Sequence, residues 1–368
     1  MLPANGLLEH AEALTDSVQL VDRILRAGLF THASDIHLDP AADGTRVRFR
    51  IDGELEEVLH IPAAMQAAVT SRLKVLAGLD IAERRAPQDG GFAWRLPTGG
   101  ARAGQAAAAL DIRMATLPVR HGERVTLRLL ETGGRRLTLD ELGMSDADRA
   151  AFDAIIRRPH GLVLLTGPTG SGKTTTLYAA IQELLKGEPK NILTVEDPIE
   201  YEIPGVAQAE VDSADKVNFA KALKSLLRHD PDVVMIGEIR DAASLDAAVK
   251  AALTGHLVLS TLHTNDARAT VTRLVDMGLD PALVPATLRL AVAQRLVRRL
   301  CPACRRPGPN GYEPVGCPSC GGRGYAGRIG IFELYEPGGD ANRPTMKDDA
   351  RAKVAAGITS LAEVMKVL

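Results

Sequence analysis

The sequence predicts an α/β protein, and three observations support this fold class. From residue 161 onward, short apolar runs alternate with helical stretches, which is typical of buried parallel strands joined by crossover helices. Before about residue 131, apolar and charged residues alternate, as in strands with one solvated face. All four cysteines fall within residues 301–320. We therefore expect a smaller α+β domain, then an α/β domain that carries a compact cysteine-containing subdomain.

The composition is that of a folded protein. Its 368 residues correspond to roughly two to three domains, and 45% hydrophobic with 24% charged residues exclude wholesale disorder. The formal charge of −2 argues against a protein that coats nucleic acid, and 3% aromatic residues leave few stacking platforms for single strands. The chain shows no membrane-spanning apolar run and no signal-peptide pattern, so we expect a cytoplasmic location, where disulfide bonds are rare.

The first domain is expected over residues 1–131. A helix is predicted from about residue 18, with Asp16 or Ser17 as its cap. The segments RVRFRI at 46–51 and RVTLRL at 124–129 predict strands with polar residues, mostly arginines, on one face and apolar side chains on the other. Asp52-Gly53 predicts a hairpin turn, and the stretch at 65–85 predicts a helix with Gly78 near its end.

The second domain is expected over residues 148–368, after a linker at 132–147 in which Ser145 caps the next helix. Buried strands are predicted at 161–166, 191–196, 232–237 and 256–261, with helices at 174–186 and 217–228. A tetracysteine subdomain is expected at about 298–325. A short helical segment at 345–368 follows, and Thr359 or Ser360 opens its last helix.

The segment GPTGSGKT, from Gly167 to Thr174, is a complete P-loop motif between a predicted strand and a predicted helix. Its glycines allow backbone N–H groups to turn toward phosphate oxygens at a positive helix N-terminus. Lys173 would reach the β- and γ-phosphates of ATP, and the Thr174 hydroxyl would ligate Mg²⁺. The residues expected to bind nucleotide are Gly167, Pro168, Thr169, Gly170, Ser171, Gly172, Lys173, Thr174 and Thr175.

Acidic residues follow two of the predicted strands. Glu238 ends the strand at 232–237, and Glu196 with Asp197 ends the strand at 191–196. Because the carboxyl ends of parallel strands meet at one edge of a sheet, Glu196 and Glu238 would act near a γ-phosphate, on the Mg²⁺ shell or on the attacking water. The alternative is that they are ordinary loop acids.

Two histidines, His256 and His263, bracket the predicted strand HLVLST and the residues that follow it. A histidine beside a γ-phosphate can sense that phosphate by hydrogen bonding, whereas a lone histidine is more often structural. The sequence leaves both interpretations open for each residue.

The cysteines form two Cys-x₂-Cys pairs, Cys301 with Cys304 and Cys317 with Cys320, separated by twelve residues. Each pair offers two thiolates at the spacing of a structural Zn²⁺ site, and four thiolates leave no open position for catalysis. Reduced free thiols or an iron–sulfur cluster are the alternatives.

Several motifs, in order, resemble those of the type II secretion and type IV pilus assembly ATPases. GPTGSGKTTTLY, ILTVEDPIEY, DPDVVMIGEIRD and TGHLVLSTLHTNDA are similar to the family's Walker A, Asp, Walker B and His boxes. ASDIH, RFRIDG and AGLDIAERRAPQDG are similar to its second N-terminal domain, and VAQRLVRRLCPAC and GYAGRIGIFEL to its assembly and secretion branch. The resemblance covers about residues 18–335 and AGITSLAEV. It implies a RecA-like P-loop ATPase domain, a PAS-like N-terminal domain, a zinc-binding subdomain and a hexameric ring with ATP between domains.

The resemblance also implies a role for arginines. Arg48, Arg50, Arg113 and Arg128 would reach the γ-phosphate as mobile arginine fingers, or else they form the solvated face of a sheet. Arg240 is a further candidate. The expected catalytic set is completed by Lys173, Glu196, Glu238 and His263.

The family implies partners at a membrane. We expect a homo-hexamer that binds an inner-membrane platform protein and a docking protein, and through them lies peripherally at the cytoplasmic face of the inner membrane, with no nucleic acid. The chain departs from the family in starting near the second N-terminal domain, so the usual docking domain is expected to be absent. The stretch after IFEL is short, and AGQAAAAL at 103–110 blurs the strand expected before DIRM. The tetracysteine motif favours assembly or secretion over pilus retraction.

The function expected is therefore ATP hydrolysis that powers type II secretion or the assembly of a pilin-like fibre. One alternative is a RecA-like DNA translocase or DNA-uptake motor, which DNA-stimulated, salt-sensitive ATPase activity would reveal. Another is a regulatory nucleotide-binding module, which would release no phosphate.

Overall fold

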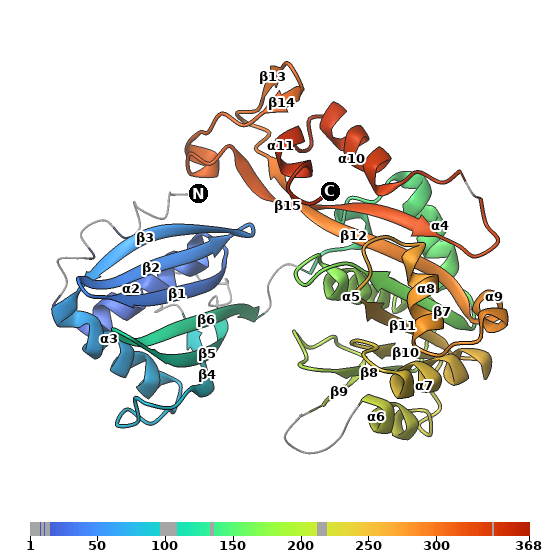
Figure 1. The fold of residues 1–368 in the computed structure, drawn as a ribbon, viewed down its shortest axis with the longest axis horizontal. Helices are drawn as coiled ribbons and strands as arrows, with labels where there is room; N and C mark the ends of the chain where they lie inside the picture. Colours follow the sequence, from blue (N-terminus) through green and yellow to red (C-terminus); the bar gives the residue numbers. More distant parts are fainter. Residues whose placement is uncertain are drawn as a thin grey trace. The chain divides into compact units, whose positions relative to one another are not determined.

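The structure is a computed structural model that describes residues 15–95, 109–132, 136–211, 219–340 and 342–368, together with Leu8 and Ala11 (Figure 1). Its contacts divide the chain into two compact units. The first comprises Met1–Arg135, Leu300–Pro307 and Glu313–Gly327, and the second comprises Arg136–Arg299, Gly308–Tyr312 and Arg328–Leu368. Part of the expected linker, at 133–135, and residues 103–108 of the AGQAAAAL segment lie outside the described residues.

The first unit contains a six-stranded sheet in the order β3-β2-β1-β6-β5-β4, with antiparallel neighbours. Two helices, α2 and α3, pack on one face, where Leu25 and Leu73 join Phe49 and Leu127 of the strands in one core. The opposite face carries the arginines. The elements are α2 Ser17–Phe30, β1 Ala33–Ala41, β2 Gly44–Ile51, β3 Glu54–Pro62, α3 Ala63–Leu76, β4 Gln88–Arg95, β5 Ala109–Val119 and β6 Gly122–Thr132.

The alternation that predicts β2 is confirmed. Val47, Phe49 and Ile51 are buried, and the residues between them lie on the other face. The turn after this strand is also confirmed, because Asp52 and Gly53 both have positive φ, 51° and 91°, as a two-residue hairpin loop of this kind requires.

The two helices of this unit begin and end where local chemistry dictates. Asp16 caps α2 by accepting a hydrogen bond of 2.8 Å from the Val18 backbone N–H. The second helix, α3, ends at Leu76, and Gly78 follows with a φ of 68°. Residues 79–85, which the sequence predicts as a continuation of this helix, form bends and irregular structure instead.

The second unit is built on a seven-stranded sheet in the order β15-β12-β7-β11-β10-β8-β9 (Figure 1). The pairs β12–β7, β7–β11, β11–β10, β10–β8 and β8–β9 are parallel. Its strands are β7 Gly161–Thr166, β8 Ile192–Glu196, β9 Ala207–Glu210, β10 Val233–Ile236, β11 Leu257–Leu262, β12 Leu288–Leu300 and β15 Tyr325–Tyr335. The four predicted strands are confirmed as β7, β8, β10 and β11, and β9, β12 and β15 are three strands that the sequence does not predict.

Helices pack on both faces of this sheet. On one face, α4 and α5 contribute Phe152 and Ile181 to a core with Val163 of β7. On the other, α6 and α7 contribute Leu223 and Ala248 to a second core. The helices are α4 Asp146–Ile156, α5 Lys173–Leu184, α6 Phe219–Leu226, α7 Ala242–Leu253, α8 Ala269–Asp276, α9 Val284–Thr287, α10 Met346–Ala355 and α11 Leu361–Val364. The arrangement is that of a doubly wound α/β domain.

The last two helices are joined to the edge of the sheet by polar contacts. Ser360 caps α11, as expected, and Glu363 in this helix forms an ion pair of 2.6 Å with Arg298 of β12. Asp349 of α10 accepts a hydrogen bond of 2.8 Å from the backbone N–H of Phe332 in β15. In the portion of the chain that the structure describes, we find no helix with the length and apolar character needed to cross a bilayer.

Candidate active site and metal centre

The P-loop joins β7 to α5 at the carboxyl edge of the parallel sheet. Its first glycine, Gly167, has a φ of 146°, and a Cβ there would lie 2.5 Å from the Gln294 carbonyl oxygen. Gly172 ends the loop in the left-handed region, with a φ of 89°, directly before Lys173 opens α5. Only glycine therefore suits these two positions, and the loop they shape surrounds the helix N-terminus.

Two donors of the loop, Lys173 and Ser171, have no carboxylate partner among the residues that the structure describes. Lys173 is 9% exposed, and its Nζ donates to the carbonyl oxygens of Gly167 at 2.8 Å and Pro168 at 3.1 Å. Burial lowers the pKa of Lys173, and the charge of Glu238 acts against this. The buried Oγ of Ser171 finds no hydrogen-bond partner among the described residues. A loop with a buried ammonium and an orphaned hydroxyl fits the oxygens of a phosphate chain.

The other residues predicted to bind nucleotide differ in their exposure to solvent. Thr174 and Thr175 are half-buried in the first turn of α5, and Pro168, Thr169 and Gly170 are exposed. A Cβ at Gly170 would meet nothing within 4 Å, so the top of the loop is open.

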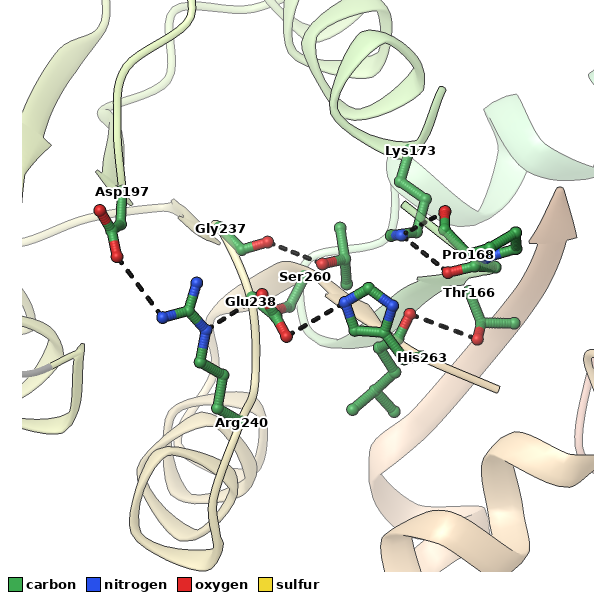
Figure 2. A network of polar contacts seen from close by, with 12 residues as sticks. Thr166, Pro168, Lys173, Asp197, Gly237, Glu238, Arg240, Ser260 and His263 are labelled. Carbon is green, nitrogen blue, oxygen red and sulfur yellow. Dashed lines mark hydrogen bonds and ion pairs between the residues drawn. The ribbon is translucent and has the colours of Figure 1, made fainter. Parts of the chain in front are cut away.

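Four polar side chains form a chain along the same sheet edge, across the ends of β8, β10 and β11 (Figure 2). Asp197 Oδ2 lies 3.5 Å from Arg240 Nη1, and Arg240 Nε lies 3.1 Å from Glu238 Oε2. The other oxygen of Glu238, Oε1, lies 3.2 Å from His263 Nε2. The structure thus brings together three of the predicted catalytic residues, Glu238, Arg240 and His263, with Lys173 at the same edge.

Glu196 lies outside this chain. It ends β8 but is only 2% exposed, and it accepts hydrogen bonds from Thr194 at 2.6 Å, from Gln208 at 3.0 Å and from the Tyr178 hydroxyl of α5. Burial raises the pKa of Tyr178 far above its usual range, and the hydrogen bond to Glu196 adds to the rise. Both oxygens of Glu196 are therefore engaged inside the domain, beneath the loop that begins with Asp197.

The two histidines lie at opposite ends of β11. His256 precedes the strand, and its Nδ1 is 3.1 Å from the Ala251 carbonyl oxygen at the end of α7. His263 follows the strand and contacts Glu238. Only the second is at the carboxyl edge with the P-loop.

Sequence reasoning missed the contribution of β12 to the P-loop. Gln294 Oε1 accepts a hydrogen bond of 2.9 Å from Thr176 of α5, and Arg295 Nη2 donates to the Asn265 carbonyl at 2.8 Å. In the sequence this strand corresponds to the segment VAQRLVRRL, in which apolar and polar residues alternate only weakly. Nothing in that segment indicates that it pairs with β7.

The candidate arginine fingers lie on the sheet of the first unit. Arg48 pairs with Asp39 at 2.7 Å, and Arg128 pairs with Asp35 at 3.2 Å. Arg50 donates to the Gly53 carbonyl at 2.9 Å, and Arg113 lies opposite Arg128 in the register of β5 and β6. They share one face of the sheet with the aspartates of β1.

The four cysteines converge. Their Sγ atoms lie within 4.8 Å of one another, with 3.9 Å between Cys301 and Cys317, 3.9 Å between Cys304 and Cys320, and 3.8 Å between Cys317 and Cys320. Four sulfurs bound at about 2.3 Å to a tetrahedral Zn²⁺ would lie about 3.8 Å apart, so the donor set fits that ion.

The thiols of this cluster differ in acidity. Burial raises the pKa of Cys301 to about 11. Burial acts in the same direction on Cys320, but hydrogen bonds from the backbone N–H groups of Cys317 and Gly324 outweigh it and lower the pKa of Cys320 to about 6. Backbone donors of this kind stabilise the thiolate form that binds metal.

A P-loop at the edge of a doubly wound parallel sheet, with Glu238 after the strand β10 and His263 after β11, defines a P-loop ATPase of the RecA-like class. The chain belongs to the type II/IV secretion system protein family, whose model matches residues 11–366.

Relatives with known names support this assignment. The chain is 46% identical to type II secretion system protein HxcR of Pseudomonas aeruginosa, over 95% of this chain and 77% of that protein. It is 44% identical to the type II secretion system ATPase E of Vibrio cholerae, over 100% of this chain and 78% of that protein. It is 47% identical to the type IV pilus assembly ATPase PilB of Myxococcus xanthus, over 89% of this chain and 60% of that protein.

Solved structures share the fold. The Legionella pneumophila ATPase DotB has a TM-score of 0.70 at 22% identity, and each chain covers 95% of the other. The pilus retraction motor PilT with bound ADP has a TM-score of 0.63 at 25% identity, over 94% of this chain and 96% of that one.

Proposed function

We propose that this chain is a motor ATPase that hydrolyses Mg²⁺-ATP to power type II secretion or the assembly of a type IV pilus-like fibre. One juxtaposition carries the proposal: buried Lys173 in the P-loop and the Glu238–His263 pair lie at one edge of the sheet. Membership of the secretion family and the names of the relatives support the process that this hydrolysis drives.

The residues of the loop would bind the nucleotide. Lys173 and the backbone N–H groups would hold the β- and γ-phosphates, and these oxygens would give the orphaned Ser171 hydroxyl a partner. The Thr174 hydroxyl would ligate Mg²⁺, which supplies charge neutralisation at the β- and γ-phosphate oxygens when bound.

Glu238 is the best candidate to orient the attacking water. His263 and Arg240 each hold one oxygen of its carboxylate, so the group is positioned before the substrate arrives. We assign Glu196 the role of a positioning residue, which differs from the direct role of Glu238. Glu196 accepts hydrogen bonds from Tyr178 and Gln208, and these fix the start of the loop that carries Asp197.

The arginine face of the first unit fits a role between subunits. In a homo-hexamer, Arg48, Arg50, Arg113 and Arg128 would supply cations to the γ-phosphate. The aspartates that pair with Arg48 and Arg128 would hold these side chains in place until the phosphate competes for them. The four cysteines would bind one structural Zn²⁺.

The proposed partners follow from the process. An inner-membrane platform protein and a docking protein would hold the hexamer at the cytoplasmic face of the inner membrane. The tetracysteine centre favours secretion or assembly, as opposed to retraction. DNA is not an expected ligand, since the formal charge is −2 and the relatives above are named for protein secretion and pilus assembly.

Phosphate release by the purified chain and two variants tests the proposal. Lys173→Ala should lose nucleotide binding, whereas Glu238→Gln should bind ATP as the parent does and lose at least about 100-fold in turnover. Parental turnover by Glu238→Gln would remove Glu238 from the chemistry. A parent that binds ATP and releases no phosphate would indicate a regulatory module, and steep salt-sensitive stimulation by DNA would indicate a DNA motor.

A further inference from the structure

Arg295 approaches the phosphate-binding loop from outside the P-loop motif. β12 runs beside β7 with Ala293 opposite Thr166, so Arg295 lies just beyond the level at which β7 ends. Its Nη1 would lie 3.0 Å from a Cβ on Gly167, and its Nη2 donates to the Asn265 carbonyl at 2.8 Å. The guanidinium therefore extends from β12 past the first residue of the P-loop to the loop after β11.

The guanidinium of Arg295 is half-buried, and it forms no ion pair with a carboxylate of the described residues. Its hydrogen bonds within the described chain go to two backbone carbonyls, those of Gln294 at 3.1 Å and Asn265 at 2.8 Å. Burial lowers the pKa of Arg295, and the charge of Asp266 only partly opposes this. A planar guanidinium has five N–H donors, so two carbonyl contacts leave capacity for an anion.

Arg295 and Lys173 flank the same glycine. Lys173 Nζ donates to the Gly167 carbonyl at 2.8 Å, and Arg295 Nη1 lies beside the Cα of that residue. Burial is the main cause of the lowered pKa of Lys173, and repulsion from Arg295 adds to it. Two partly desolvated cations in such proximity favour binding of an anion with several oxygens.

The position of Arg295 indicates which part of a nucleotide it would meet. The Arg295 guanidinium donates a hydrogen bond to the backbone carbonyl of Asn265, which is two residues after His263. His263 in turn contacts Glu238. Arg295 thus lies toward the side of the P-loop that carries the hydrolytic residues, where the γ-phosphate of a bound triphosphate would be.

We infer that Arg295 is a phosphate-binding residue that donates to the terminal phosphate of a nucleoside triphosphate from within the same chain. This inference rests on the proposed ATP site and adds a cation that differs in origin from the arginines of the first unit. Because Arg295 also holds the Asn265 carbonyl, it would connect the presence of the γ-phosphate to the loop that carries His263.

Equilibrium binding of ADP and of the non-hydrolysable analogue adenosine 5′-(β,γ-imido)triphosphate, each with Mg²⁺, tests the inference on the full chain. Arg295→Gln should weaken binding of the triphosphate analogue by at least about tenfold and change ADP binding by less than about twofold. Arg299→Gln is the matched control, since Arg299 is exposed on the same strand and its loss removes the same charge. It should change neither affinity.

A purely structural role for Arg295 predicts a different pattern. Equal weakening of both nucleotides, or no weakening, in Arg295→Gln would overturn the inference. If that variant does not fold, Arg295→Lys replaces it. A lysine keeps the charge but lacks the planar set of donors of the guanidinium, so it should weaken binding of the triphosphate analogue selectively, by less than Arg295→Gln would. Equal weakening of both nucleotides, or no weakening, would again overturn the inference. A parental chain that binds both nucleotides but releases no phosphate would contradict the proposed function while leaving this comparison valid.

Discussion

Glu238 Oε1 lies 3.2 Å from His263 Nε2, and this contact joins the ends of the neighbouring strands β10 and β11. Below it, the Thr261 hydroxyl donates to the Gly237 carbonyl at 2.8 Å, and the Ser260 hydroxyl donates to the Ile236 carbonyl at 2.7 Å. The two strand ends are therefore fixed relative to each other. His263 holds one oxygen of a carboxylate whose other oxygen is held by Arg240.

Replacing His263 should impair turnover more than binding. In His263→Ala, Glu238 loses one of its two positioning contacts, while the P-loop donors to the phosphates stay in place. We expect phosphate release at saturating ATP to fall by about tenfold to 100-fold, with ATP affinity changed by less than about threefold. Steady-state phosphate release and equilibrium nucleotide binding measure the two quantities.

His256 provides the matched control for this prediction. It lies at the other end of β11, where its Nδ1 contacts the Ala251 carbonyl, away from the P-loop. His256→Ala should keep parental turnover. If both histidine variants lose turnover equally, the effect reflects the packing of β11, and the positioning role of His263 is contradicted.

The sequence predicts those parts of the site that depend on local pattern. The P-loop and the strands before Glu238 and His263 are recognisable because apolar runs and glycines are contiguous in the chain. The contacts of Arg295 cannot be recognised in the sequence, because they depend on the pairing of β12 with β7, which is a long-range tertiary interaction. The burial of Glu196 cannot be predicted from the sequence for the same reason, because the Tyr178 hydroxyl that donates a hydrogen bond to it comes from a different element, α5.

Arg128 is predicted to act on turnover through the arginine face of the first unit. Its side chain is 66% exposed although Nε pairs with Asp35 at 3.2 Å, so the rest of the guanidinium is open to a second anion. Arg128→Gln should lower the turnover of the assembled protein by at least about tenfold. Arg46, exposed in β2 of the same sheet, supplies the control, and Arg46→Gln should retain turnover. Equal activities of the two variants would count against the finger role of Arg128.

Removal of metal should destabilise the tetracysteine centre. We expect one zinc per chain after purification without chelators, because the sulfur separations fit a tetrahedral ion. Cys304→Ser should lose the metal and lower the melting temperature, as should a strong chelator on the parent. Ser319→Ala, an exposed position between two of the ligands, should change neither. Metal analysis that finds iron, or no metal at all, would contradict the zinc assignment.

The Arg298–Glu363 pair predicts how stability responds to acid. The side chains are only 18% and 6% exposed, and the contact measures 2.6 Å. Burial acts to raise the pKa of Glu363, but hydrogen bonds from Arg298 and Lys366 outweigh it and lower the pKa from 4.5 to about 2. Because the folded pKa is the lower one, the ionised pair stabilises the fold fully above about pH 4.5, and this contribution is lost as the pH falls through about 2.

Glu363→Gln should therefore lower the free energy of unfolding by about 2–3 kcal/mol at pH 7, as measured by urea denaturation. The difference from the parent should shrink steadily between about pH 4.5 and about pH 2, since protonation removes the same charge from the parent. Asp246→Asn breaks the exposed Lys250–Asp246 pair on α7, where solvent screens the charges, and should have little effect at any pH. A Glu363→Gln deficit that stays constant across this range would mean that packing of α11, and not ionisation, holds the helix against β12.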